Sequence, residues 1–279
     1  MPYLIFDIES NPDVDRILAT EDAKARESTI DPNRLETRDE VAARVLEGLC
    51  KEPNCMPPTR FHVPNTIVAL LVNDQLQYIT HAAFAARNAK GVDWEANTKG
   101  FWDAYNWAQT SYPNGVTLVG FNSMKFDMPV MEICGLAAKL NMSNWFKLGG
   151  GTPSYKDPRS RFATALHLDL YYYLNNGGSI GGSLSYWSRL AGLPGKLGTN
   201  GGAVAELLKV PSGRELLIDY CSCDVMNTYG LLYRLLYTSG LVASDWKGDV
   251  FNDTMAKVFA GRGAECTAFI NFIKADGLF

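Results

Sequence analysis

The sequence predicts an α/β protein in which a mixed β-sheet is flanked by helices and the C-terminal half is mainly helical. Short apolar runs between turn residues predict strands in the first half of the chain. Helical periodicity dominates from residue 167 onward. Strands that come first, with helices inserted between them and added after them, are typical of a mixed sheet with helical layers.

The first predicted element is a buried strand over residues 3–9, an apolar run that ends in acidic residues. Residues 10–60 differ from it, because they are polar, charged and prone to form helix. Thr37 and Glu40 fit a capping box that opens a helix running through Leu49. We therefore expect residues 10–60 to form a polar helical insertion.

Turn and cap residues divide the rest of the chain. Asn73 and Asp74 form a turn between two strands, and Asp93 is placed to cap a helix. The predicted strands cover residues 65–72, 75–80 and 115–121, and the predicted helices cover residues 94–110, 128–140, 183–191, 203–209, 213–237 and 250–274. Between them lies a predicted loop, residues 144–162, whose basic residues are Lys147, Lys156, Arg159 and Arg161.

The composition is that of a globular protein. The 279 residues are 47% hydrophobic, enough for one large core, and we expect a single domain over residues 1–279 with a C-terminal helical extension over 239–279. No apolar run approaches about 18 residues and no basic leader precedes the first strand, which argues against membrane insertion and secretion.

The six cysteines form no C-x-x-C pair, so we expect reduced thiols and a cytoplasmic location. A net charge of -4 excludes a global basic field but not local basic patches.

Asp7 and Glu9 are the first candidates for chemistry. Residues two apart in a strand face the same way, so both carboxylates project from one face and can share a hard cation such as Mg²⁺. Chance alone gives about three acid pairs at this spacing in such a composition, and the chain has that number. This pair differs from the other two because it ends an apolar strand, where unpaired carboxylates are costly.

Two further segments carry carboxylates. Residues 119–127 place Asn122 and Asp127 where a strand gives way to a helix, and a simple helix cap is the favoured interpretation of Asp127 in isolation. Tyr220 and Asp224 are four residues apart in a strongly helical stretch, so they lie on one helix face. A tyrosine packed beside a surface acid is the alternative for that pair.

The order of these segments resembles the tyrosine branch of the DEDD superfamily of 3′→5′ exonucleases: an Asp-x-Glu strand, then Asn-x-x-x-Phe-Asp, then Tyr-x-x-x-Asp. Within that branch the chain is similar to stand-alone exonucleases related to the proofreading domain of family B DNA polymerases. Segments 60–62, 167–169 and 190–196 also match. Ser10 departs from the pattern, since many relatives have Thr at this position.

The resemblance implies a ribonuclease H-like fold with four acids at one end of the sheet. Asp7, Glu9 and Asp224 would hold one Mg²⁺ or Mn²⁺ ion, Asp7 would also reach a second ion, and Asp127 would act on that second ion through water. Tyr220 would orient the attacking water. The implied activity is hydrolysis of terminal phosphodiester bonds of single-stranded DNA, with release of nucleoside 5′-monophosphates.

The same resemblance makes Ser10, Asn122 and Phe126 candidates for contacts with the terminal nucleotides, although a core position is the favoured alternative for Phe126. The basic residues of 144–162 either follow the phosphates or form a solvated loop. Asp169 is expected to have a structural hydrogen-bonding role, with a fifth acid near the site as the alternative, and His167 is expected to be a core residue with its hydrogen bonds satisfied. Residues 10–60 either shape access of the 3′ end to the site or pack elsewhere for stability.

Two other functions remain open from the sequence. One is trimming of RNA 3′ ends, because the motifs do not identify the protein groups that would contact the terminal ribose and distinguish it from deoxyribose. The other is a catalytically silent nucleic-acid-binding module on the same fold. Inactive relatives typically lose a metal-binding carboxylate, and here all four acids and Tyr220 are present, which favours an enzyme.

Overall fold

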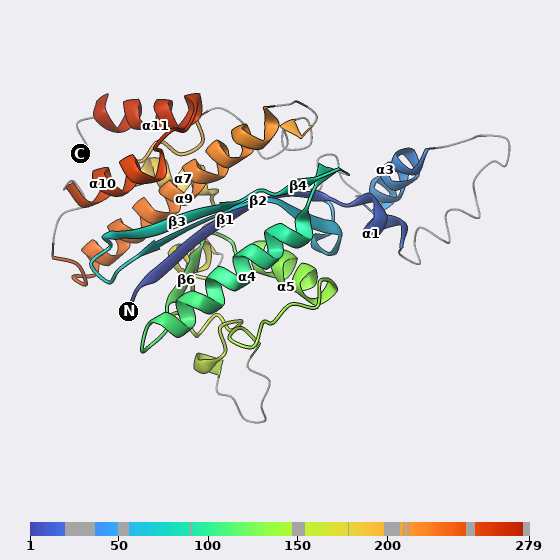
Figure 1. Ribbon diagram of the computed structural model, residues 1–279. Helices are drawn as coiled ribbons and strands as arrows, with labels where there is room; N and C mark the ends of the chain where they lie inside the picture. Colours follow the sequence, from blue (N-terminus) through green and yellow to red (C-terminus); the bar gives the residue numbers. More distant parts are fainter. Residues whose placement is uncertain are drawn as a thin grey trace.

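The computed structural model describes residues 1–19, 37–49, 56–89, 91–146, 154–177, 179–197, 207–208, 210, 212–243 and 249–275. A five-stranded sheet forms its centre, with the strand order β3-β2-β1-β6-β7 (Figure 1). These strands are β1 (Tyr3–Pro12), β2 (His62–Val72), β3 (Tyr78–Phe84), β6 (Thr117–Gly120) and β7 (His167–Asp169). Strand β1 runs antiparallel to β2 and parallel to β6, so the sheet is mixed.

Helices cover both faces of this sheet. Helices α4 (Trp94–Ser111) and α5 (Asp127–Ala137) lie on one face, and the long helix α9 (Gly213–Thr238) lies on the other (Figure 1). The remaining elements are α1 (Val14–Leu18), α3 (Arg38–Leu49), η1 (Thr59–Phe61), β4 (Arg87–Asn88), β5 (Gly91–Val92), η2 (Ser154–Lys156), α6 (Leu170–Leu174), α7 (Leu184–Leu190), α10 (Asp249–Val258) and α11 (Ala264–Ala275). This arrangement confirms the predicted fold class and is consistent with a ribonuclease H-like α/β fold.

Strand β1 lies between two separate hydrophobic cores. Leu4, Phe6 and Ile8 pack into the core beneath α4 and α5, whereas Ile5 packs into the core beneath α9. Because side chains alternate along a strand, Asp7 and Glu9 lie on the same face as Ile5. The periodicity that buries β1 therefore turns both carboxylates towards α9.

Most predicted elements are present with shifted ends. Thr37 and Glu40 form the predicted capping box, since the Thr37 N–H donates to Glu40 Oε2 at 2.8 Å and the Glu40 N–H donates to Thr37 Oγ1 at 3.3 Å. Asp93 caps α4 by accepting from the Ala96 N–H. The strand predicted at 75–80 begins later, at Tyr78, because the Asn73 side chain accepts backbone N–H groups up to Gln77 and keeps this segment in a turn.

Two features from His167 onward differ from the predicted elements. Residues 167–169 form β7, a three-residue strand beside β6 for which no element was predicted. A strand this short shows no periodicity of its own and is fixed by its pairing with β6. The single helix predicted over 250–274 is divided into α10 and α11, with Gly261 between them at φ +71°. Residues 203–206 and 209 of the helix predicted over 203–209 lie outside the described residues.

The described part of segment 10–60 has a small core of its own. Ile17 of α1 packs with Ala42 and Val45 of α3 and with Phe61. The Arg16 guanidinium donates to the His62 carbonyl at 3.0 Å, which attaches α1 to the start of β2. The first strand also continues to Pro12, so its last residues fall inside the segment predicted to be an insertion.

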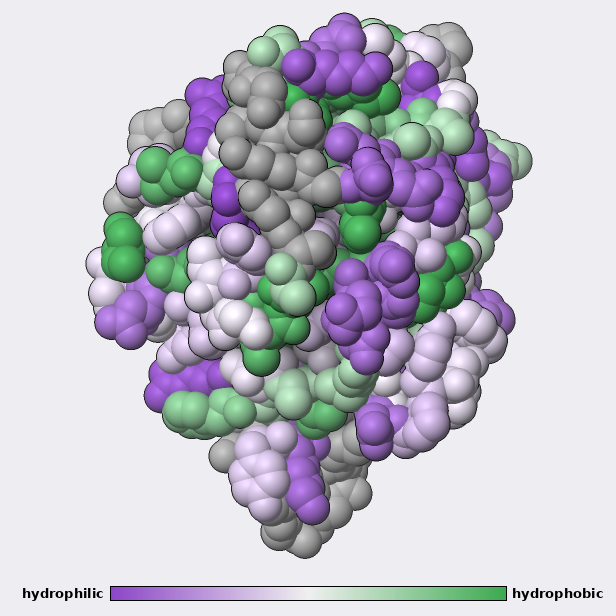
Figure 2. Space-filling view, turned by 90° about the vertical axis from the view of Figure 1, so that its left-hand side faces the viewer, coloured by the Kyte–Doolittle hydropathy of each residue, from purple (hydrophilic) through white to green (hydrophobic). Residues whose placement is uncertain are grey.

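No helix in the described ranges combines the length and the apolar character needed to cross a lipid bilayer. Figure 2 shows the face at the left of Figure 1, where the coloured hydrophilic and hydrophobic residues are interspersed.

Asp169 fixes the loop that joins β6 to α5. Its carboxylate accepts the N–H groups of Asn122 and Met124 at 2.9 Å and of Tyr172 at 3.3 Å. Asn122 has φ +62°, a left-handed conformation that needs such support. Beneath the loop, His167 is fully buried and bonded to Ser123 at 2.9 Å. The structural roles expected for Asp169 and His167 are confirmed.

We predict that Asp169→Ala lowers the free energy of unfolding by about 2–4 kcal/mol, because it leaves buried backbone N–H groups without an acceptor. Chemical denaturation measures this change. Asp103→Ala is the control, since its exposed ion pair with Lys99 is worth less than about 1 kcal/mol. Equal losses in the two variants would contradict the anchoring role of Asp169.

Candidate active site

Three carboxylates converge between the sheet and α9. Asp7 and Glu9 of β1 and Asp224 of α9 offer oxygen atoms that all lie within 4.8 Å of one another. Glu9 and Asp224 are buried, and Asp7 is half-buried. Residues from opposite ends of the chain therefore form one acidic cluster, which we call the carboxylate cluster.

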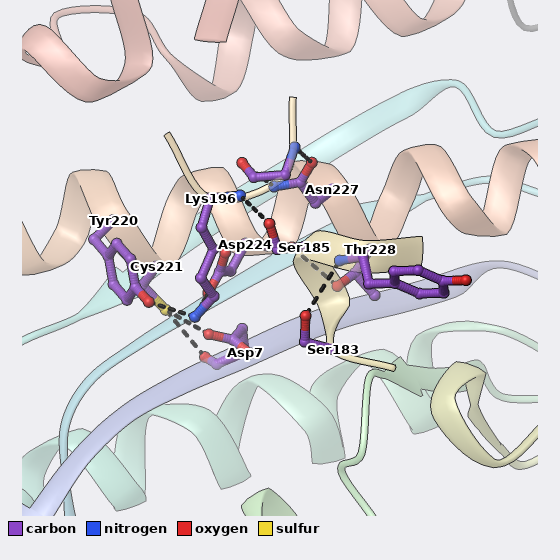
Figure 3. Close-up of polar contacts among 11 residues, drawn as sticks. Asp7, Ser183, Ser185, Lys196, Tyr220, Cys221, Asp224, Asn227 and Thr228 are labelled. Carbon is purple, nitrogen blue, oxygen red and sulfur yellow. Dashed lines mark hydrogen bonds and ion pairs between the residues drawn. The ribbon is translucent and has the colours of Figure 1, made fainter. Parts of the chain in front are cut away.

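The packing of α9 against β1 positions the cluster. Tyr220 and Asp224 are four residues apart and lie on the same face of the helix, as predicted (Figure 3). Between them, Cys221 is fully buried, and its thiol donates to the Asp7 backbone carbonyl at 3.3 Å. This contact ties the middle of β1 to α9.

Lys196 places a positive charge beside the carboxylate cluster. Its Nζ lies 3.0 Å from Asp224 Oδ2 and donates a hydrogen bond to the Tyr220 hydroxyl. Figure 3 shows the side chain reaching between these two residues towards Asp7. The preceding residue, Gly195, exchanges two hydrogen bonds of 3.1 Å with the Asn227 side chain, so α9 also holds the lysine segment.

Asp127 is the first residue of α5, the helix on the other face of the sheet, and its charge acts on Asp7 and Glu9. The interpretation of Asp127 as a simple helix cap is wrong, because Phe126 occupies the cap position of α5 and Asp127 is its first helical residue. The side chain is buried, and burial together with the charges of Asp169 and Asp224 raises its pKa to about 7. The loop that Asp169 anchors therefore delivers a fourth acid to the electrostatic field of the cluster.

The acids in the cluster perturb one another. Burial raises the pKa of Asp7 well above its usual range, and the charges of Asp224, Asp127 and Glu9 raise it further. Burial and the charge of Asp224 also raise the pKa of Glu9 well above its usual range. Burial also raises the pKa of Asp224, against the opposing effect of Lys196. Protons and the lysine therefore balance part of the negative charge in the metal-free protein.

The pKa of Tyr220 is also shifted. Burial raises it above its usual value, and the charges of Asp224 and Glu9 add to the shift, while Lys196 opposes it. The phenol therefore keeps its proton at neutral pH and is a hydrogen-bonding group rather than a general base.

The donor set fits a hard divalent cation. Asp7, Glu9 and Asp224 present only carboxylate oxygens, which are the ligands that Mg²⁺ and Mn²⁺ prefer. The Nζ of Lys196 already lies against Asp224, so the cluster accommodates a positive charge at this point.

The candidates for nucleotide contact are less closely grouped. Ser10 follows Glu9 at a β-bulge, and its hydroxyl lies 3.0 Å from His62 Nδ1. The ring of Phe126 meets the His62 ring edge-on with centroids 5.1 Å apart and packs at the margin of the core beneath α4 and α5. Asn122 is fixed through its backbone to Asp169. Ser10 and Phe126 thus meet at His62, while Asn122 lies in the loop that leads to Asp127.

Sequence reasoning missed two charged groups at the site. Lys196 was noted only as part of a matching segment, and a single lysine well before Tyr220 carries no local signal. Glu265 of α11 raises the pKa values of Glu9 and Asp224 through its charge. It shares the lining of a small cavity with Lys196. Only the folding of α11 onto α9 brings it there.

The chain matches one family model, described as a predicted 3'-5' exonuclease related to the exonuclease domain of PolB, over residues 57–271. Since more than half of the chain matches, the protein belongs to this family. Membership supports nuclease function and implies a nucleic-acid substrate. No match was found among curated proteins or among solved structures.

The matched range begins after β1, so Asp7 and Glu9 lie outside it, whereas Asp127, Tyr220 and Asp224 lie inside. The structure joins the two parts, because β1 pairs with β2 and β6, which both belong to the matched range.

We predict that the titration of Asp127 lowers the stability of the metal-free protein as the pH rises from about 4 to about 7. Folded Asp127 has a pKa of about 7, above its ordinary value of 3.8, so the folded state binds more protons than the unfolded state in this window. Each such group costs up to about 1.4 kcal/mol per pH unit. Asp127→Asn removes this titrating proton. In EDTA, the free energy of unfolding of this variant should therefore fall less steeply with pH than that of the wild type. Parallel declines in denaturant titrations would show that Asp127 is not the group responsible.

Proposed function

We propose that this protein is a metal-dependent 3′→5′ exonuclease of the tyrosine branch of the DEDD superfamily. Its substrate in this proposal is single-stranded DNA, and its products are nucleoside 5′-monophosphates. One observation carries the proposal: Asp7, Glu9 and Asp224 converge within 4.8 Å in a chain of a predicted 3'-5' exonuclease family. The Tyr220 hydroxyl beside Asp224 supports the tyrosine branch.

The proposed metal ligands are those that the family resemblance implies, and the convergence of three carboxylates supports the first ion. Asp7, Glu9 and Asp224 would hold one Mg²⁺ or Mn²⁺ ion, Asp7 would also contact a second, and Asp127 would contribute through water. When bound, these ions would lower the pKa of the attacking water and balance the charge on the leaving 3′ oxygen.

The remaining steps belong to the side chains. Tyr220 keeps its proton and can orient the attacking water by a hydrogen bond, a role that fits its raised pKa. Lys196 holds the Tyr220 hydroxyl in place and reduces the repulsion that an incoming phosphate meets at Asp224. Ser10, Asn122 and Phe126 are proposed to contact the terminal nucleotides.

The alternatives predict different behaviour. An RNA-trimming enzyme would use the same carboxylates on a ribose substrate. A silent binding module would bind nucleic acid without cleaving it. All four acids are present, and the oxygen atoms of three of them are close enough together to bind one metal ion, which favours catalysis.

We also propose one exonuclease domain over residues 1–279 and a cytoplasmic location.

The proposed function predicts stepwise shortening of 5′-labelled single-stranded DNA from its 3′ end in Mg²⁺ or Mn²⁺. Ca²⁺ should bind yet support cleavage poorly, because it tolerates looser coordination geometry. Duplex DNA and RNA of the same sequence test the substrate class on denaturing gels. Undiminished cleavage in excess EDTA, after removal of trace metal, would overturn the metal-dependent mechanism.

Tyr220 and Asp224 should differ in function although they share a helix face. We expect Tyr220→Phe to lose about 10²–10⁴-fold in rate with nearly normal metal affinity, since only an orienting hydrogen bond is removed. Asp224→Ala should lose both activity and affinity for the first ion, as measured by Mn²⁺ calorimetry. Equal damage to metal binding in the two variants would refute the orienting role, and full activity of Tyr220→Phe would leave Tyr220 as a packed aromatic residue.

A further inference from the structure

A second hollow lies beside the loop that carries Asp127. It measures about 650 Å³ and is bounded by residues 161–164, by the end of β7 and by α6 with the turn that follows it. We call it the α6 hollow. A smaller hollow of about 120 Å³ shares Met124 and His167 with it and extends to Met128 and Pro129, directly after Asp127. The two hollows therefore adjoin each other beside the loop that ends at Asp127.

The wall of the α6 hollow carries a cation and exposed aromatic rings. The Arg161 guanidinium lies 4.8 Å from the Phe162 ring centroid and 5.8 Å from that of Tyr172. Phe162 is 63% exposed and Tyr173 is 54% exposed, although both are large aromatic residues. Exposed rings and a guanidinium plane are surfaces on which nucleobases stack, and arginine is also a phosphate-binding group.

The charge of Arg161 is available for a ligand. Within the described residues Arg161 forms no ion pair with a carboxylate, whereas its neighbour Arg159 is paired with Glu132 at 3.0 Å. Asp169 is the one carboxylate among the described residues that line the hollow, and it is 4% exposed and already accepts three backbone N–H groups. Arg161 is therefore a cation in the wall of the hollow with no carboxylate partner among the described residues.

We propose that the α6 hollow binds a nucleotide of single-stranded DNA upstream of the scissile bond, with its phosphate on Arg161 and its base against Phe162 and Tyr173. The inference rests on the proposed function, because in an exonuclease the nucleotides upstream of the scissile bond extend from the active site across the protein surface. A volume of about 650 Å³ lies in the range of small-ligand sites and is sufficient for one nucleotide. Loop 121–126 connects the two regions along the chain, because its Met124 lines the hollow and Asp127 follows the loop directly.

The test compares a long substrate with a short one. The octamer d(T)8 reaches the hollow, whereas the p-nitrophenyl ester of thymidine 5′-monophosphate reports only the chemistry at the carboxylate cluster. For Arg161→Gln combined with Tyr173→Ala, we expect the ratio of kcat/KM for d(T)8 to that for the ester to fall about 5- to 150-fold, the range for loss of one stacked base. Arg161→Gln alone should reduce the salt dependence of d(T)8 binding by about 0.7 in the log–log slope.

Two variants serve as matched controls. Trp107→Ala removes an aromatic ring that is 52% exposed on α4, and Arg38→Gln removes an exposed guanidinium on α3. Both should leave the ratio unchanged. A ratio that stays constant in the double variant, or that falls equally in the controls, would overturn the subsite.

Binding separates this inference from the proposed function. If the wild type hydrolyses neither substrate, the exonuclease proposal fails, and the fluorescence anisotropy of labelled d(T)8 in Ca²⁺ still tests the hollow. Weaker binding by the double variant supports the subsite, and equal binding overturns it. A loss confined to r(U)8 would overturn DNA as the occupant.

Discussion

Repulsion among buried carboxylates is the constraint on which the rest of this structure depends. Asp7, Glu9 and Asp224 lie within 4.8 Å of one another, and Asp127 adds to the same field. Such a cluster is stable only where positive charge or protons balance it. In this protein the balance comes from Lys196 and from raised carboxyl pKa values. The site is therefore stabilised by the same kinds of charge that a divalent cation would replace.

This constraint explains why the site is held from several directions. Strand β1 is central in the sheet and has hydrogen-bonded neighbours on both sides, so the spacing of its two acids is rigid. Helix α9 is largely buried and fixes Tyr220 and Asp224 together. Asp169 fixes the loop that ends at Asp127. Groups that repel one another would move apart on flexible elements, so the rigid elements supply the opposing force.

The sequence predicted the parts of the fold that local signals determine. The apolar run of β1, the caps at Thr37 and Asp93 and the four-residue spacing on α9 are all local, and the structure contains each of them. The three-residue strand β7 was missed because it is defined by its partner strand rather than by its own residues. The charges of Lys196 and Glu265 were missed for the same reason, since tertiary packing alone brings them to the site.

The distribution of charge also bears on how an acidic protein can accept a polyanion. The net charge of -4 and the carboxylate cluster oppose the approach of nucleic acid, so attraction has to come from bound cations or from local basic groups. The ammonium group of Lys196 already forms an ion pair with Asp224. The guanidinium of Arg161 forms no ion pair with a carboxylate within the described residues. A strand that met Arg161 first would gain contacts to its backbone before its end reached the acids. Loop 121–126 contributes Met124 to the α6 hollow and leads directly to Asp127, and it is fixed at both ends, by β6 and by α5. The rigidity of this loop would then set the distance between the nucleotide bound at Arg161 and the phosphodiester bond that is cleaved. Asp169, which anchors the loop, would therefore influence catalysis without contacting the substrate.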